Sequence, residues 1–229
     1  MVENQATTAA FQQSAAHRQS GLERPVPPVR RWSSKRILDL LIAWPAVVAL
    51  SPLMSLIALL VRLHLGSPIL FRQTRAGLGG ATFNVFKFRT MTDCRDASGF
   101  LLDDQARATG FGRLLRGTSL DELPQLWNVI RGEMSLVGPR PLLPEYTARY
   151  TRHQQRRLEV LPGITGWAQI NGRNTLSWER KFELDVWYVE HRDFWLDAQI
   201  LARTIINVFR RAGIRAADHE TMPEFRGTR

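Results

Sequence analysis

Residues 37–61 form the longest apolar run of the chain, and Asp39 is the only charge in it. As one helix, the run would extend about 37 Å, enough to cross a hydrocarbon core of about 30 Å. Ser51 and Pro52 lie in its middle, and proline both removes a helix hydrogen bond and disfavours helical geometry in the residue before it. Each half is then too short to cross a bilayer alone, at about 20 Å and about 15 Å.

The charges on both sides of this run favour a re-entrant hairpin over a membrane-spanning anchor. Positive residues stay on the cytoplasmic side of a membrane, so basic flanks at both ends indicate that both ends lie there. We therefore predict a helix–break–helix hairpin that enters one leaflet, with its break at Ser51 and Pro52; a plain transmembrane anchor is the alternative. The flanking basic residues are Arg30, Arg31, Lys35 and Arg36 before the run, and Arg62, His64, Arg72 and Arg75 after it.

Alternating polar and apolar positions predict a small β-hairpin over residues 68–89. Its arms, Pro68–Arg72 and Thr82–Phe88, flank a glycine-rich turn. Lys87 and Arg89 lie together at the end of the second arm, where they are either solvated charges or a binding pair.

Helical periodicity dominates the rest of the chain, so we predict a helix-rich α+β fold. Residues 177–213 are typical of two helices, broken near Arg192–Trp195, that carry aromatic and basic side chains. Such side chains favour the membrane–water interface, which predicts amphipathic interfacial helices; a plain aromatic core is the alternative. Further helices are predicted just before residue 118, from about Leu120 to Ile130, and over Tyr146–Leu161.

Composition adds a strong positive charge: 31 basic residues against 21 acidic ones give a net charge of +10. This balance indicates an anionic partner such as nucleic acid, anionic lipid or a phosphorylated substrate. The single Cys94 excludes an internal disulfide framework and fits a reducing compartment, and the five scattered histidines have no zinc-site spacing.

The candidate chemistry centres on the adjacent carboxylates Asp121 and Glu122. Ser119 and Glu122 also have the spacing of a capping box, which predicts a helix start whether or not the pair is catalytic. A helix N-terminus attracts anions, so phosphate would be favoured there. Several cations near the glycine-rich loops would suit a polyphosphate substrate, with a divalent metal between carboxylate and phosphate. These cations are Lys87, Arg89, Arg116, Arg140 and Arg173.

Three motifs make the chain recognisable: KFRTM at 87–91, TSLDELPQLWNVIRGEMSLVGPRPLL at 118–143 and PGITGWAQINGRN at 162–174. They resemble the bacterial sugar transferase family, the monotopic phosphoglycosyl transferases that start lipid-linked glycan assembly. The resemblance covers about residues 32–226 and is to the short members of the family. WAQINGRN, FELDVWYVEH and TMPEFRG are most similar to enzymes that transfer N-acetylated bacillosamine-type sugar phosphates.

The resemblance implies transfer of a hexose-1-phosphate from a UDP-sugar to undecaprenyl phosphate, with release of UMP. Asp121 would attack the β-phosphate and become a phosphosugar intermediate, and Mg²⁺ would bind at Asp121 and Glu122. Ser51 and Pro52 would correspond to the break in the family's re-entrant helix. The phosphate-binding cations would be Lys87, Arg89, Arg116, Arg140 and Arg173, and we assign the nucleotide-sugar loop to Gln169, Asn171 and Asn174.

The expected organisation therefore has three parts. Residues 1–31 are a disordered basic and Pro-rich tail, 32–64 a re-entrant membrane helix, and 65–229 a cytosolic catalytic domain. The protein would act at the cytoplasmic face of a bacterial inner membrane, on anionic lipids of the inner leaflet, without a nucleic-acid partner; a homodimer is left open. Gly117, just before the acid pair, departs from the family, which usually has a larger residue there. The resemblance therefore does not imply how rigid the backbone is at this position.

Two other functions fit parts of the pattern. A membrane-tethered protein that binds anionic lipid or nucleic acid would use the positive charge without any catalysis, and a salt-dependent titration against DNA would identify it. A glycosyltransferase of the Leloir class would need a metal-binding acidic motif. Asp103 and Asp104 are the candidates for that motif, and we interpret them as solvated loop residues.

Overall fold

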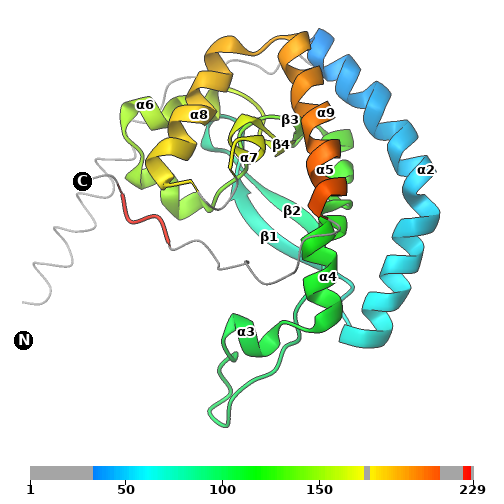
Figure 1. Ribbon diagram of the computed structural model, residues 1–229. Coiled ribbons are helices and arrows are strands. Elements are labelled where there is room, and N and C mark those ends of the chain that lie inside the picture. The colour runs from blue at the N-terminus through cyan, green and yellow to red at the C-terminus, as the bar shows by residue number, and fades with distance from the viewer. Residues whose placement is uncertain (1–32, 173–175, 212–223, 228–229) are drawn as a thin grey trace, which may run out of the picture. The chain divides into compact units, whose positions relative to one another are not determined.

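The computed structural model describes residues 33–172, 176–211 and 224–227. The predicted tail, Arg173 and Asn174 lie outside the described residues. Helices flank two small sheets in this part of the chain, which confirms the helix-rich α+β fold (Figure 1). In chain order the elements are α2 (Ser34–Leu65), β1 (Leu70–Ala76), η2 (Leu78–Gly80), β2 (Thr82–Phe88), α3 (Asp104–Arg107), α4 (Gly110–Thr118), η3 (Leu120–Glu122), α5 (Gln125–Arg131), β3 (Ser135–Val137), η4 (Pro144–Arg149), α6 (Arg152–Gln155), η5 (Arg156–Glu159), β4 (Gly163–Thr165), α7 (Trp167–Ile170), α8 (Trp178–His191) and α9 (Phe194–Arg211).

Helix α2 is continuous, which corrects the predicted break at Ser51 and Pro52. Pro52 has no N–H to donate to the carbonyl of Val48, and Ser51 Oγ donates to that carbonyl instead, at 2.8 Å. Because the freed carbonyl is satisfied locally, the helix does not separate into two; its ribbon bows along its length (Figure 1). Within the described ranges, α2 is the helix that is long and apolar enough to cross a membrane.

The first turns of α2 are fixed to the rest of the fold by polar contacts. The Arg36 guanidinium donates to the carbonyls of Val129 and Ile130, at 2.5 and 2.8 Å, and so satisfies the last turn of α5. Asp39, the charge within the apolar run, is buried and accepts hydrogen bonds from Ser135 Oγ and Leu136 N, both at 3.1 Å. This carboxylate is therefore used within the protein and does not face lipid.

The last turns of α2 are fixed by apolar contacts. Ile57, Val61 and Leu65 are buried in one cluster with Phe88 of β2 and Leu115 of α4. Between the two ends, several large apolar side chains of the helix are exposed; examples are Trp44 at 51%, Val48 at 66% and Leu59 at 54%. Both ends of α2 therefore pack against one folded unit, and the large side chains exposed between them are apolar.

The two sheets have two strands each, and only the second joins segments that lie far apart in the chain. β1 and β2 pair antiparallel, with Gln73 opposite Val85, which confirms the predicted hairpin. β3 and β4 pair in parallel and join the chain near residue 135 to the chain near residue 163. The backbones meet so closely beyond β3 that a Cβ on Gly138 would lie 2.4 Å from the carbonyl oxygen of Leu161, so this position requires glycine.

The helix predicted over Tyr146–Leu161 is wrong as a single element, because short turns replace it. Tyr150 is extended, with φ −73° and ψ 139°, and ends η4. Thr151 then starts α6 with a capping box, exchanging hydrogen bonds with Gln154. A capping residue in mid-segment begins a new helix, which the overall periodicity did not reveal.

The two C-terminal helices are separated at Arg192, as predicted. Their aromatic residues support both interpretations of the sequence. Phe182 of α8 is buried, in one aromatic cluster with Tyr150 and Phe225. Trp195 of α9 is 77% exposed and its neighbour Phe194 is 56% exposed. Phe182 and Tyr188 of α8 therefore contribute to the core, whereas Phe194 and Trp195 at the start of α9 form an exposed apolar surface.

Candidate active site

The acid pair lies in a tight turn between α4 and α5. Ser119 ends α4 in the left-handed region, at φ 59°, and η3 follows immediately. The predicted capping box is wrong, because the Ser119 side chain makes no capping hydrogen bond to this turn. A residue that closes one helix with positive φ does not have the extended backbone of an N-cap, so Glu122 is available for other partners.

Glu122 is held by two cations from separate segments. Lys87 Nζ of β2 lies 2.7 Å from Glu122 Oε1, and Arg140 Nη2 lies 2.6 Å from the same oxygen. Burial alone would raise the pKa of this carboxyl, but Arg140 and Lys87 outweigh burial and hold the pKa far below its usual range. Glu122 is therefore ionised at any physiological pH.

Asp121 is in the opposite electrostatic situation, although it is the adjacent residue. Its side chain is buried, and no described residue hydrogen-bonds its carboxylate. Burial and the neighbouring Glu122 charge raise the pKa of Asp121 to about 6, against the opposing effects of Lys87, Arg140 and Arg116. An ionised but unpaired carboxylate among cations is suited to attack an electrophilic phosphorus.

Three of the predicted phosphate-binding cations act on this acid pair. Lys87 and Arg140 contact Glu122 directly, and Arg140 is 44% exposed. Arg116 Nε donates to Thr90 Oγ1 at 2.9 Å, and its charge lowers the pKa of Asp121. The turn is therefore lined with positive charge from β2, α4 and the loop after β3.

Arg89 has a different position from the one predicted. Its guanidinium donates to the carbonyls of Ser67 and Met91, at 2.6 and 2.8 Å, and pairs with Asp93 at 2.6 Å. The side chain is buried, and its donors hold together the chain on both sides of the β-hairpin. The prediction that Arg89 binds phosphate is therefore not supported by its placement.

Arg75 also belongs to the site, although the sequence pattern presented it only as a flanking charge. Burial and the charge of Arg140 lower the pKa of the Arg75 guanidinium, so it belongs to the same group of cations. The hairpin register pairs residues 71, 73 and 75 with 87, 85 and 83, which puts Arg75 and Lys87 on one face. The alternation of the strands was the signal that could have identified it.

A second missed feature is a buried ion pair behind Arg140. Arg157 Nη2 donates to the backbone carbonyl of Arg140 at 2.6 Å and to Asp185 Oδ2 at 2.8 Å. The side chains of Arg157 and Asp185 are only 2% and 5% exposed. This pair fixes the backbone from which the Arg140 side chain reaches Glu122.

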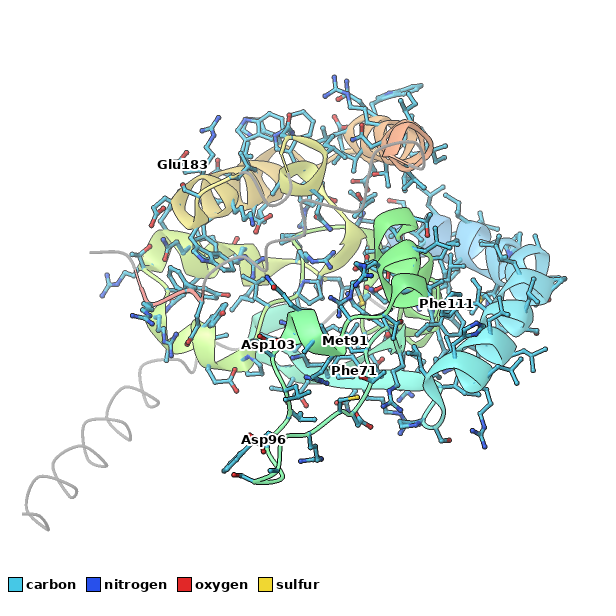
Figure 2. The ribbon with its side chains drawn as sticks, turned by 60° about the horizontal axis from the view of Figure 1, so that its bottom comes forward. Phe71, Met91, Asp96, Asp103, Phe111 and Glu183 are labelled. Atoms are coloured by element: carbon cyan, nitrogen blue, oxygen red, sulfur yellow. The ribbon has the colours of Figure 1, made fainter. Side chains whose placement is uncertain are left out.

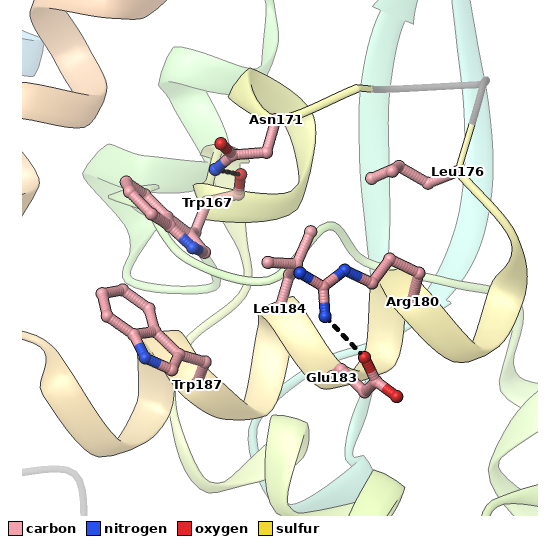
Figure 3. A pocket seen from close by; sticks show the side chains of 7 residues that line it. All are labelled: Trp167, Asn171, Leu176, Arg180, Glu183, Leu184 and Trp187. Atoms are coloured by element: carbon pink, nitrogen blue, oxygen red, sulfur yellow. Dashed lines mark hydrogen bonds and ion pairs between the residues drawn. The ribbon is translucent and has the colours of Figure 1, made fainter.

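The residues predicted to hold the nucleotide sugar make local contacts. Gln169 Nε2 donates to the carbonyl of Ile164 at 2.9 Å, and Asn171 Nδ2 to that of Trp167 at 2.8 Å. Asn171 also lines a cavity of about 480 Å³ between α7 and α8 (Figure 3). The other lining residues are Trp167, Leu176, Arg180, Glu183, Leu184 and Trp187.

The acidic residues Asp103 and Asp104 are structural. Asp103 Oδ1 accepts a hydrogen bond from Ala106 N at 2.8 Å and caps α3, and Asp104 pairs with Arg107 at 3.6 Å. Figure 2 shows Asp103 at the base of this short helix and Asp96 at the tip of the loop before it. A metal-binding motif of the Leloir class is therefore not supported at this position.

Asp121 and Glu122 can contribute only part of a magnesium site. Among the described residues, no group of three or more His, Cys, Asp or Glu side chains could hold a metal ion. Mg²⁺ commonly binds through one or two carboxylates and completes its shell with substrate phosphates and water. The donor set therefore fits Mg²⁺ that binds together with a polyphosphate.

Comparison with known proteins identifies the family. The "Bacterial sugar transferase" family matches residues 30–211. "Uncharacterized sugar transferase EpsL" of Bacillus subtilis is 53% identical, over 85% of this chain and 96% of its own length. The "UDP-glucose:undecaprenyl-phosphate glucose-1-phosphate transferase" of Caulobacter vibrioides is 40% identical, over 79% and 72%. The "UDP-N-acetylgalactosamine-undecaprenyl-phosphate N-acetylgalactosaminephosphotransferase" of Aeromonas hydrophila is 36% identical, over 79% and 45%. The chain belongs to the bacterial sugar transferase family.

Proposed function

We propose that this protein transfers a sugar-1-phosphate from a UDP-sugar to undecaprenyl phosphate and so starts the synthesis of a polysaccharide. The named relatives from Caulobacter vibrioides and Aeromonas hydrophila act on such substrates. The observation that carries the proposal is Asp121, a buried carboxylate without a hydrogen-bond partner among the described residues and beside three cations. A non-catalytic lipid- or nucleic-acid-binding protein would not need this arrangement.

The reaction proceeds in two displacements at one phosphorus atom. An ionised oxygen of Asp121 forms a bond to the β-phosphorus of the UDP-sugar, and the bond from that phosphorus to the bridging oxygen breaks. The electron pair stays on the bridging oxygen, and UMP leaves. A phosphate oxygen of undecaprenyl phosphate then attacks the same phosphorus, and Asp121 leaves as a carboxylate, so neither step needs a net proton transfer.

The cations around the turn stabilise the charge that moves during this reaction. Arg140 and Lys87 hold Glu122 ionised, and with Arg116 they face the phosphate oxygens that approach Asp121. Mg²⁺, when bound at Asp121 and Glu122 with the pyrophosphate, would neutralise phosphate charge as a Lewis acid. We expect EDTA to abolish turnover and added Mg²⁺ to restore it; full activity in EDTA would contradict the metal assignment.

A covalent adduct tests the nucleophile. Incubation of the purified protein with a UDP-sugar alone should release UMP and add a sugar-phosphate mass to the peptide that contains Asp121. Asp121→Asn should form no adduct, whereas Glu122→Gln retains the nucleophile and should form it slowly. A lipid product made without any adduct on the wild-type protein would overturn the proposal.

We also infer that α2 lies within the cytoplasmic leaflet of the membrane, with both of its ends on the cytoplasmic side. The two ends of α2 pack against the same folded unit, through Arg36 and Asp39 at one end and Val61 at the other. A helix that spanned the bilayer would carry one of these contacts to the opposite side. The exposed apolar side chains between the two ends support contact with lipid.

Cys94 offers a direct test of this orientation, because it is the single cysteine of the chain and is exposed. In inverted membrane vesicles, an impermeant maleimide should label Cys94, and a protease should remove a tag placed before Trp32. Labelling of Cys94 with protection of the tag would indicate a spanning helix and contradict the inference.

For the sugar itself, we propose an N-acetylated bacillosamine-type donor, on the similarity of WAQINGRN and FELDVWYVEH to enzymes of that type. Relatives that use glucose and N-acetylgalactosamine define the competing donors. A panel of UDP-sugars assayed for UMP release should rank the bacillosamine-type donor first. Preference for UDP-glucose would overturn the sugar assignment and leave the reaction class intact.

A further inference from the structure

Arg75 is a half-buried cation that no acidic side chain neutralises directly. Its Nη2 donates at 2.5 Å to Oε1 of Gln73, a neutral amide two residues earlier on β1. Burial and the charge of Arg140 lower its pKa against the opposing charges of Glu145 and Glu122, but neither carboxylate forms an ion pair with it among the described residues. Arginines are seldom buried unless they are paired, so this guanidinium has donors left for a ligand.

The end of β1 holds Arg75 beside the loop that carries Arg140. Ala76 N donates to the carbonyl of Leu142 at 2.9 Å, so the residue after Arg75 is bonded to a residue two positions beyond Arg140. Strand alternation also puts Arg75 on the same face of the hairpin as Lys87. Arg75 therefore approaches the acid pair from the hairpin, next to the two cations that hold Glu122.

This group of cations carries more positive charge than its ion pairs neutralise. Lys87 and Arg140 share one oxygen of Glu122. Arg75 adds a further positive charge beside them without an ion pair of its own. Like charges close together in a partly buried place are unfavourable, and a bound anion removes the conflict. The surplus of charge therefore indicates that an anion binds at this place.

Arg75 and Arg116 lie toward different parts of the site. Arg116 is among the cations whose charges act most strongly on Asp121, and Arg75 is not. Arg75 is acted on instead by the charges of Arg140 and Glu122. Arg140 acts on both Asp121 and Arg75. A phosphate at Asp121 would therefore meet Arg116 and Arg140, and the next phosphate of the same pyrophosphate would meet Arg140 and Arg75.

We propose that Arg75 binds the α-phosphate of the UDP-sugar, which is the phosphate that leaves as part of UMP. This inference rests on the proposed function. A guanidinium has five N–H donors in a planar fork; the contact with Gln73 uses one, orients the fork and leaves the others for phosphate oxygens. When the bond from the β-phosphorus to the bridging oxygen breaks, negative charge grows on the departing UMP, and Arg75 stabilises it there. Arg75 forms no covalent bond and transfers no proton.

UMP is the probe for this contact, because it carries the α-phosphate and no β-phosphate. The full-length protein with Arg75→Met should bind UMP roughly 10- to 100-fold more weakly than the wild type, since hydrogen bonds to a charged group are lost. Its affinity for uridine, which has no phosphate, should stay the same. Formation of the Asp121 adduct from a UDP-sugar should slow, whereas transfer from the finished adduct to undecaprenyl phosphate should keep its rate.

Arg72→Met is the matched control, because it removes an arginine from the opposite face of the same strand. Its guanidinium lies over the ring of Phe86, 5.4 Å from the ring centroid. Arg72→Met should leave UMP affinity and both half-reactions unchanged. Arg75→Lys keeps the positive charge and loses the planar fork, so its UMP affinity should lie between those of the wild type and Arg75→Met.

The outcomes separate this inference from the proposed function. Unchanged UMP affinity in Arg75→Met would overturn the role of Arg75 and leave the proposed function standing. Slower transfer to undecaprenyl phosphate with normal adduct formation would put Arg75 on the lipid phosphate and overturn the assignment to the α-phosphate. Equal weakening of UMP and uridine binding would assign Arg75 a structural role and overturn the inference. A wild-type protein that forms no adduct with any UDP-sugar would overturn the proposed function and, with it, this inference.

Discussion

Arg140 connects two acidic centres that are satisfied to very different degrees. Its backbone carbonyl accepts a hydrogen bond from Arg157, whose guanidinium also pairs with Asp185 and reaches Tyr150 Oη. Its side chain pairs with Glu122, which lies next to the unpaired Asp121. The first centre is buried and complete, whereas the second holds a buried carboxylate that no described residue hydrogen-bonds.

The difference indicates that the Arg157–Asp185 centre stabilises the fold, whereas the Asp121–Glu122 centre takes part in the reaction. A fully paired buried network is rigid, and it fixes the backbone on which it acts. Unpaired buried groups lower stability and persist where a ligand uses them. Substitutions at the first centre should therefore act mainly on folding, and substitutions at the second mainly on the reaction.

The largest effect is expected for Asp121→Asn. Turnover should fall by roughly 10⁴-fold or more, because the nucleophile is lost. Stability should change in the opposite direction, because ionised Asp121 is unfavourable in the folded state. Its pKa is raised from 3.8 to about 6, so this unfavourable contribution is absent below about pH 4 and complete above about pH 6. Chemical unfolding should show a gain on the order of 2–3 kcal/mol at pH 8 that disappears toward pH 4.

The next effect is expected at the buried pair. Arg157→Met leaves Asp185 buried without its partner and should lower the free energy of unfolding by about 3–5 kcal/mol. The double variant Arg157→Met with Asp185→Leu should recover much of that loss, because no charge is then left unpaired. Denaturant unfolding of the single and double variants measures this, and equal losses in both would contradict a charge-based explanation.

Arg140→Ala should reduce kcat/KM roughly 100-fold, because a cation facing the phosphate is lost and Glu122 keeps only Lys87. Arg95→Ala is the matched control, since Arg95 lies on an exposed loop, where it donates to the carbonyl of Gly99 at 2.7 Å. Its effect on stability should be below about 0.5 kcal/mol. Equal losses of activity in the two variants would contradict a specific role of Arg140 in the site.

The smallest effect is the pH dependence of the wild-type enzyme. Asp121 must be ionised to attack, so kcat/KM should fall about tenfold for each pH unit below about 6 and level off above it. Glu122 should add no step in this range, because Arg140 and Lys87 hold its pKa far lower. A rate profile between pH 5 and pH 8 for UMP release checks this, and a flat profile would contradict the raised pKa of Asp121.

Local patterns in the sequence predicted several elements correctly. The apolar run became α2, the alternation at 68–89 became the hairpin, and the break near Arg192 separates α8 from α9. The family followed from contiguous motifs, and the match to residues 30–211 confirms it. These features depend on residues close together in the chain, so the sequence contains them directly.

Other features depended on contacts between distant segments. The sequence predicted the same phosphate-binding role for Lys87 and Arg89. Of these two, only Lys87 contacts Glu122, whereas Arg89 holds the ends of the hairpin together. Ser119 and Glu122 have capping spacing, but the left-handed backbone at Ser119 prevents the cap. In each case the side chain had more than one available partner, and packing selected one.

The sequence by itself determined the apolar helix, the hairpin, the adjacent acids and the basic residues, because periodicity and motifs are local properties. Only the tertiary structure decided that Asp121 is buried without a hydrogen-bond partner among the described residues, and that Glu122 is held ionised. The reason is physical: burial and the pairing of charges depend on which distant segments meet, and the pKa of a carboxylate follows from that environment.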